Sequence, residues 1–118
     1  MGGSHVGGVS VLNLHVADLP GGTFGVSTVP QYAAGNPRLD GIWIDRGTWR
    51  GNPKEGTHFT YQGDTAVHEA GHWIGALAHT DTSGRCLPNF MSYASDSCMT
   101  SFNRPQATRM SNAWNRYR

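Results

Sequence analysis

A five-residue segment near the middle of the chain, His68 to His72, constrains the fold more than any other part of the sequence. It reads His-Glu-Ala-Gly-His, with histidines at positions i and i+4. In an α-helix these two side chains lie one turn apart on the same face, so both imidazoles can reach one metal ion. Glu69 is rotated by about 100° from His68 around the helix axis, which places it to act on a metal-activated water as a general base rather than to bind the metal. The segment therefore predicts a metal-binding helix.

The residues around this segment predict where the helix begins and ends. Asp64 is a favourable N-cap residue and Gly75 is a favourable residue for ending a helix, so we expect the helix between them. Val67, Ala70 and Ile74 recur at helical spacing away from the histidines. We expect that side of the helix to pack on the core.

A catalytic zinc site needs a third protein ligand and an open position. No glutamate follows the helix, which excludes the zinc hydrolases that take their third ligand from a glutamate on a later helix. The downstream candidates are His79, Asp81 and Asp96, of which we prefer His79. On an unbroken helix His79 would lie about 10 Å beyond His72, so the helix has to end before it, as Gly75 predicts.

The composition predicts a small domain with a thin core. Leu, Ile, Val and Phe make up 20 of the 118 residues, whereas Gly and Pro make up 22. The aliphatic and Phe fraction is below the roughly 20% typical of an ordinary core, and such a domain usually needs a metal or a disulfide. Cys86 and Cys98 are twelve residues apart; they can close a short disulfide loop or remain as two free thiols.

The low charge and the lack of a long apolar segment argue against several classes of partner. The net charge is +1 and only 14% of residues are charged, which argues against nucleic acid or an anionic membrane as a partner. No apolar run approaches the roughly 18 residues of a membrane span. Residues 1–8 lack the pattern of a signal peptide, so we expect them to be a flexible leader and residues 9–118 to form one domain.

Three segments rich in apolar and β-branched residues precede the helix and predict β-strands. They are residues 9–16, 24–29 and 41–45. The first of them reads as a buried strand, and residues 46–63 read as a long exposed loop because they contain four glycines and a proline.

A second helix is predicted near the end of the chain, where Pro105 is suited to the first turn. Ala107, Met110, Trp114 and Tyr117 follow at steps of three and four residues and form one apolar stripe. We expect this stripe to pack on the core. The expected fold class is therefore α+β, with about three strands, an active-site helix and a C-terminal helix.

Several motifs resemble the metzincin metallopeptidases, and within them the pappalysin/cytophagalysin group. The segment His-Glu-Ala-Gly-His-Trp-Ile-Gly ending at Gly75, followed by His79-Thr80, is similar to the zinc-binding motif of this family. Asn89-Phe-Met-Ser-Tyr93 is similar to the group's Met-turn, and Arg109-Met110 lies in a C-terminal helix opened by a proline, as in the group. The resemblance covers roughly residues 9 to 118.

The resemblance implies a small metzincin-like peptidase core with one catalytic Zn²⁺. His68, His72 and His79 would bind this ion, although His79 lies one residue later than the family spacing. Glu69 would act as general base, and Tyr93 would stabilise the oxyanion or bind the zinc in the absence of substrate.

Further expectations come from the same resemblance. Met91 would pack beneath the metal, and a Cys86–Cys98 disulfide would enclose the Met-turn, as in secreted relatives. The strand at residues 41–45 would be the sheet edge that pairs with an extended peptide substrate. In the group, a first strand and a backing helix come before the region that matches residues 9 onward. Residues 1–8 are too few to form them, so the domain is expected to be shortened at its N-terminus.

The expected function is that of an extracellular zinc-dependent endopeptidase acting on an extended peptide or protein. The alternative is a zinc-bound, inactive relative that serves as a binding or interaction module, suggested by the shifted third histidine and the shortened N-terminus. If Asp81 takes the third ligand position instead of His79, the site resembles that of small secreted bacterial metallopeptidases.

Overall fold

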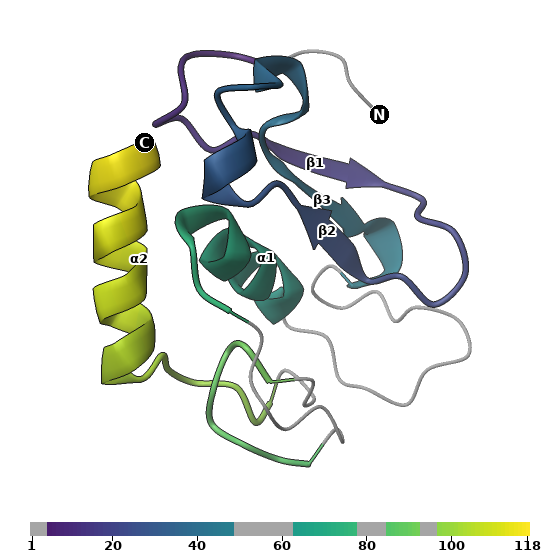
Figure 1. The fold of residues 1–118 in the computed structure, drawn as a ribbon. Helices are drawn as coiled ribbons and strands as arrows, with labels where there is room; N and C mark the ends of the chain where they lie inside the picture. Colours follow the sequence, from purple (N-terminus) through teal and green to yellow (C-terminus); the bar gives the residue numbers. More distant parts are fainter. Residues whose placement is uncertain (1–4, 49–62, 78–84, 93–96) are drawn as a thin grey trace.

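The computed structural model describes residues 5–48, 63–77, 85–92 and 97–118 of the 118-residue chain. A three-stranded sheet packs against helix α1, and helix α2 lies on the other side of α1 (Figure 1). The elements are β1 (Leu14–Ala17), β2 (Gly25–Ser27), β3 (Ile42–Asp45), α1 (Asp64–Ile74) and α2 (Arg104–Tyr117). The predicted α+β class, with three strands and two helices, is confirmed. The part of the chain that the structure describes contains no helix long and apolar enough to cross a membrane.

The strand order is β1-β3-β2, with β1 parallel and β2 antiparallel to β3. All four residues of β3 are buried, because a strand lies on each side of it and α1 covers one face. The prediction that residues 41–45 form a sheet edge is therefore wrong. Among the described residues, the edges of the sheet are β1 and β2.

Strand β1 is shorter and more exposed than the buried strand predicted for residues 9–16. Its register places Leu14 opposite Ile42 and Val16 opposite Ile44, so these four side chains share a face of the sheet. Both isoleucines are buried, whereas Leu14 is 42% and Val16 is 48% exposed. The difference arises because α1 contacts β2 and β3 on this face and leaves β1 at its margin.

The N-cap of helix α1 lies one residue earlier than expected. Gly63, with φ of 93°, is the N-cap residue, and Asp64 is the first residue of the helix. No side chain caps this end of the helix by a hydrogen bond. The prediction of Asp64 as the N-cap is therefore wrong. Its carboxylate still lies in the first helical turn, where negative charge is favourable to the helix dipole.

The predicted end of α1 at Gly75 is confirmed. Gly75 has φ of 126° and donates its backbone N–H to the carbonyls of Gly71 and His72. A side chain here would be strained by this backbone conformation. It would also place a Cβ 2.5 Å from the Cβ of Ala113 on α2.

The buried residues of α1 differ from the predicted stripe. Val67, Ala70 and Ile74 are only half-buried. The buried set is Thr65, Glu69, Gly71 and Trp73. The helix is enclosed from more than one side, by the sheet and by α2, so a single apolar face does not describe its burial.

Helix α2 opens with a capping box. The Asn103 side chain accepts from the Gln106 backbone N–H, the Gln106 side chain accepts from the Asn103 N–H, and Pro105 lies in the first turn as predicted. The predicted core stripe of α2 is only partly correct. Trp114 is 40% exposed and no α2 residue is fully buried, because the helix packs on the rest of the domain along one side only.

A buried ion pair joins Arg118, which directly follows α2, to Asp40, which lies just before β3. The Arg118 guanidinium pairs with the carboxylate of Asp40, and both side chains are inaccessible to solvent. Arg118 also donates to the backbone carbonyl of Val9 at 3.1 Å. His5, in the predicted leader, has its Nδ1 2.9 Å from the Asp40 carbonyl oxygen. Segments from both ends of the described chain thus meet at Asp40, consistent with the position of the C-terminus in Figure 1.

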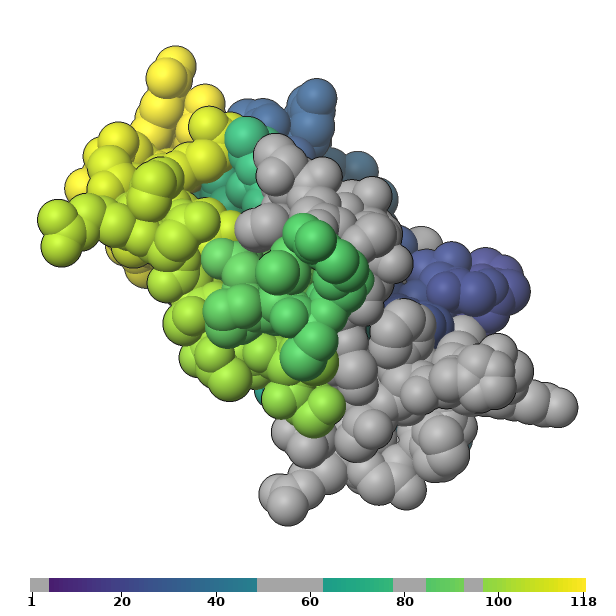
Figure 2. Space-filling model, turned by 90° about the horizontal axis from the view of Figure 1, so that it is seen from below, coloured from purple at the N-terminus to yellow at the C-terminus, as the bar shows by residue number. Residues whose placement is uncertain are grey.

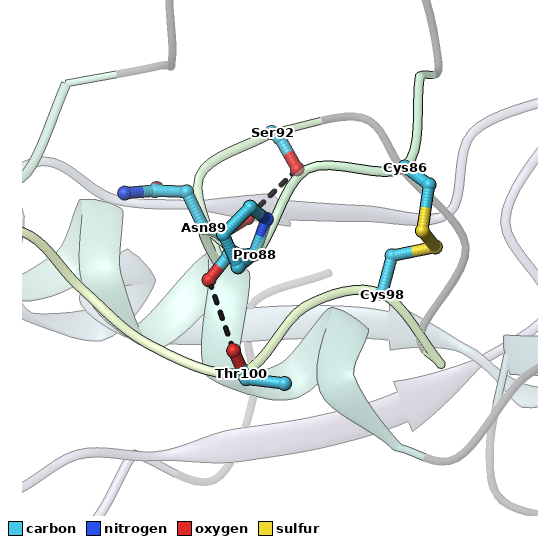
Figure 3. The surroundings of a disulfide bond; sticks show 6 residues. All are labelled: Cys86, Pro88, Asn89, Ser92, Cys98 and Thr100. Carbon is cyan, nitrogen blue, oxygen red and sulfur yellow. Dashed lines mark hydrogen bonds between the residues drawn. A yellow bond between two sulfur atoms is a disulfide. The ribbon is translucent and has the colours of Figure 1, made fainter.

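The predicted disulfide is present between Cys86 and Cys98, whose Cα atoms are 5.2 Å apart. It closes the loop that contains the Met-turn segment (Figure 3). Within this loop the Ser92 hydroxyl donates to the Asn89 carbonyl at 2.7 Å. Thr100, which lies two residues beyond Cys98, donates to the Pro88 carbonyl. The loop is therefore tied by both covalent and hydrogen bonds.

Replacing both cysteines by serine is expected to lower the free energy of unfolding by about 3 kcal/mol, because the disulfide restricts a loop of about a dozen residues in the unfolded chain. Urea unfolding of the double variant against the oxidised wild type measures the change. Ser97→Ala, at an exposed position within the same loop, is the control. Equal unfolding free energies for wild type and double variant would contradict the prediction.

Candidate metal centre

Both histidines of α1 are held by backbone carbonyls through the same ring nitrogen. The Nδ1 of His68 lies 2.7 Å from the Phe90 carbonyl oxygen, and the Nδ1 of His72 lies 3.0 Å from the Ala76 carbonyl oxygen. A carbonyl can only accept, so each Nδ1 carries the proton and each Nε2 keeps its lone pair. The ring centroids are 4.9 Å apart. This is the arrangement in which histidine binds a metal through Nε2.

Burial lowers the pKa of both histidines. For His68 the removal of water is the largest cause, the hydrogen bond to Phe90 opposes it, and the nearby His72 lowers the pKa further. For His72 burial again dominates, and the hydrogen bond to Ala76 opposes it. The neutral imidazole favoured by burial is also the form that binds a metal.

Glu69 lies on a different side of α1, against strand β2. It is 8% exposed, and burial raises its pKa to about 7, while a hydrogen bond with Ser27 acts in the opposite direction. Gly25 lies so close that a Cβ at this position would be 2.7 Å from the Cγ of Glu69. A carboxyl group with a pKa near neutrality can both accept and release a proton at neutral pH.

Gly25 and Ser27 were not predicted as neighbours of Glu69. One signal was present, since a glycine inside a strand often marks the close approach of another group. The partner could not be read from the sequence, because it depends on how α1 crosses the sheet.

Met91 packs against the middle of α1. It is fully buried, and a Cβ on Gly71 would lie 2.6 Å from its Sδ. Gly71 directly precedes His72, and Phe90, which directly precedes Met91, holds His68 through its carbonyl. The structure therefore places the Met-turn segment against the helix segment that carries both histidines.

A pair of side-chain amides ties this turn to α2. The amide groups of Asn89 and Gln106 exchange two hydrogen bonds of 2.8 and 2.9 Å. The Asn89 side chain also accepts from the Met91 backbone N–H at 2.8 Å. Figure 2 shows this segment beside the first part of α2 on one face of the molecule. Asn89 and Gln106 are supporting residues that the sequence analysis did not single out.

The remaining predicted site residues lie outside the described ranges. These are His79, Asp81, Tyr93 and Asp96. Within residues 5–48, 63–77, 85–92 and 97–118, no group of three or more His, Cys, Asp and Glu side chains could hold a metal ion. The structure brings His68 and His72 together, and the third ligand stays a prediction.

Comparison with known proteins identified a group of fungal relatives, although no protein-family profile matches the chain. An extracellular metalloprotease of Arthroderma otae is 28% identical, covering 97% of this chain and 54% of the relative. Extracellular metalloprotease 1 of Coccidioides posadasii is 31% identical, covering 95% of this chain and 52% of the relative. The chain thus spans about half the length of these relatives. The first alignment runs over 153 residues, so the matched region of that relative is longer than this 118-residue chain.

Solved structures with a similar fold include mature mirolysin of Tannerella forsythia in complex with a cleaved peptide. Its TM-score is 0.69 at 23% identity, covering 86% of this chain and 51% of mirolysin. A promirolysin mutant from the same organism gives a TM-score of 0.67 at 22% identity, covering 86% of this chain and 45% of that one. At this level of identity the similarity shows the fold.

The raised pKa of Glu69 predicts that this side chain destabilises the metal-depleted protein as pH rises. The native carboxyl keeps its proton up to about pH 7, whereas the unfolded carboxyl loses it near 4.5. The native state therefore binds more protons between these pH values, and the free energy of unfolding falls as pH rises through this window.

Glu69→Gln removes this titration. Its unfolding free energy relative to wild type is expected to increase by up to about 3 kcal/mol from pH 4.5 to above pH 7, measured by urea unfolding in the presence of a chelator. Histidine titration is common to both proteins and cancels in the difference. A difference that stays constant with pH would show that the Glu69 pKa is not raised.

Proposed function

We propose that the chain is a zinc-dependent endopeptidase of the metzincin type. Its similarity to extracellular metalloproteases of fungi and the fold that it shares with mirolysin support this proposal. One observation supports the proposal above all others. Two histidines one helical turn apart are both held through Nδ1 by backbone carbonyls, and a buried glutamate lies between them in sequence.

The donor set of α1 fits zinc. Two neutral imidazoles that present Nε2 are common zinc ligands, and we propose His79 as the third, with Asp81 as the alternative. Bound there, zinc would supply a Lewis acid for water and for the scissile carbonyl.

The remaining roles belong to residues of the chain itself. We propose that Glu69 takes a proton from the attacking water and transfers it to the leaving amine, for which a pKa of about 7 is well matched. Tyr93 is proposed to stabilise the oxyanion. Met91 forms an apolar floor below the two histidines, where it packs on Gly71.

The peptide substrate is proposed to pair with strand β2 rather than with residues 41–45. Among the described residues β2 is an edge strand, and Gly25 of β2 contacts Glu69. Val26 lies opposite Trp43 of β3, and the N–H groups of Asp45 and Thr28 bond across this strand pair. In an antiparallel pair, residues that bond the partner strand through both backbone groups alternate with residues whose backbone groups point away from it. Val26 is therefore of the first kind, and Gly25 and Ser27 direct their N–H and C=O groups toward the open edge. An extended peptide that adds a strand here would pass beside the proposed general base.

An extracellular location is supported by two findings. The fungal relatives are extracellular metalloproteases by name, and the Cys86–Cys98 disulfide is typical of an oxidising compartment.

The variant Glu69→Gln is expected to keep one zinc per chain and to lose at least about 100-fold of the peptidase rate, because a general base contributes about 10²–10⁴-fold. Zinc content by elemental analysis and cleavage of casein measure the two properties. Asp18→Asn, which changes an exposed carboxylate, is the control and should cleave at the wild-type rate.

A matched pair of histidine variants tests the ligand set in the same assay. His72→Ala should lose zinc, whereas His15→Ala, which changes a strand residue stacked on Trp43, should keep it. A wild-type protein that binds zinc but cleaves no faster than Glu69→Gln would refute the peptidase proposal and support an inactive binding module.

Pairing at β2 predicts that single backbone N-methyl groups in a peptide substrate reduce cleavage in an alternating pattern. Only every second substrate N–H points toward the strand it joins, so methylation of those positions should lower kcat/KM by about tenfold or more, since one hydrogen bond is lost and a methyl group clashes. Methylation of the positions between them is the control. Equal effects at all positions would contradict strand pairing.

A further inference from the structure

Two arginines reach the C-terminal end of α1: Arg109 of α2, and Arg118, which directly follows α2. The Nε of Arg109 donates to the Gly75 carbonyl at 2.8 Å, and the Nη2 of Arg118 donates to the Trp73 carbonyl at 2.8 Å. Carbonyls at a helix end lack donors within the helix, and this end of the helix dipole is negative. Each arginine therefore satisfies a carbonyl and places positive charge where the helix favours it.

One of these contacts lies just before the turn that orients His72, at Trp73, and the other lies within it, at Gly75. The turn runs through Gly75 to Ala76, whose carbonyl oxygen is 3.0 Å from the His72 Nδ1. Ala76 is buried and donates its own N–H to the Gly71 carbonyl at 2.8 Å. Gly75 lies against Ala113 of α2, with no room for a side chain between them. The direction of the His72 ring thus depends on a turn that α2 holds from outside.

The guanidinium of Arg118 is itself fixed in place. It lies 3.8 Å from the ring centroid of Trp73 and pairs with Asp40, whose other carboxylate oxygen accepts from the Trp73 indole N–H at 2.9 Å. Arg118 therefore holds both the backbone and the side chain of the residue that follows His72. Through Asp40 it links this end of α1 to the residues before β3.

We propose that Arg109 and Arg118 are positioning residues of the metal centre. They hold the C-terminal end of α1 so that the Ala76 carbonyl keeps the His72 imidazole in the orientation that presents Nε2 to the metal. The proposal rests on the zinc site proposed above. It assigns a role in metal affinity to two residues that are not themselves proposed ligands.

The test compares two arginines of the same helix. Arg109→Gln removes the contact with Gly75, and Arg116→Gln removes the same charge from an exposed position where the guanidinium lies over the Tyr117 ring. With zinc sulfate in competition with a chromophoric chelator, the zinc dissociation constant of Arg109→Gln is expected to rise about 10- to 100-fold, as for other residues that support a metal ligand. That of Arg116→Gln should stay within about twofold of wild type, since it touches no part of this turn.

Two further readouts separate positioning from general stabilisation. Urea unfolding in the presence of chelator should show at most a small loss of stability for Arg109→Gln relative to Arg116→Gln, because the contact of Arg109 with Gly75 is exposed. In the cobalt-substituted proteins, the visible absorption bands should change for Arg109→Gln only, because those bands report ligand geometry. Arg109→Lys, which can still donate to the Gly75 carbonyl, should restore most of the zinc affinity.

Arg118 is tested by Arg118→Lys, which keeps the charge beside Asp40 and loses the planar contact with Trp73. This variant should also weaken zinc binding. The Arg118 side chain is fully buried, so if Arg118→Lys does not fold, the Arg109 variants decide whether the proposal holds. Zinc bound equally well by Arg109→Gln and Arg116→Gln would overturn the proposal and leave the proposed function intact. A wild-type protein that binds no zinc would refute both.

Discussion

The hydrogen bonds from two imidazoles to two backbone carbonyls are the interactions on which the site depends. The Phe90 carbonyl sets the tautomer and direction of His68, and the Ala76 carbonyl does the same for His72. Each carbonyl lies in a turn rather than in a regular element, so each turn needs support. The amide pair of Asn89 and Gln106 supports the first turn. Gly75, with its positive φ, together with Arg109 and Arg118, supports the second.

The same interactions explain how a chain with few aliphatic residues holds this geometry. Its fully buried residues include Ile42, Ile44 and Met91, which form a small core around α1. The disulfide restricts the conformational freedom of the loop that carries Met91. The buried pair of Arg118 and Asp40 adds no large stabilisation of its own, because desolvation offsets much of the charge attraction. Its contribution is to fix which segments meet at the end of α1.

Local features were predictable because they depend on neighbouring residues. The spacing of His68 and His72 indicated a helix, Gly75 indicated its end, and Pro105 the start of the second helix. Properties that depend on distant segments were not predictable in this way. The strand at residues 41–45 became the centre of the sheet because two other strands pair with it, and β1 remained half-exposed because α1 lies over its neighbours.

The sequence by itself determined the chemistry that this protein can carry: a helix with two histidines on one face and a glutamate beside them. Spacing along a helix is set by backbone geometry, so these relationships hold whatever surrounds them. Only the tertiary structure decided which groups complete the site. Glu69 contacts Gly25 and Ser27, and Arg109 and Arg118 reach the end of α1. Each of these contacts joins residues more than thirty positions apart. Such contacts follow from how the layers pack, which no local pattern specifies.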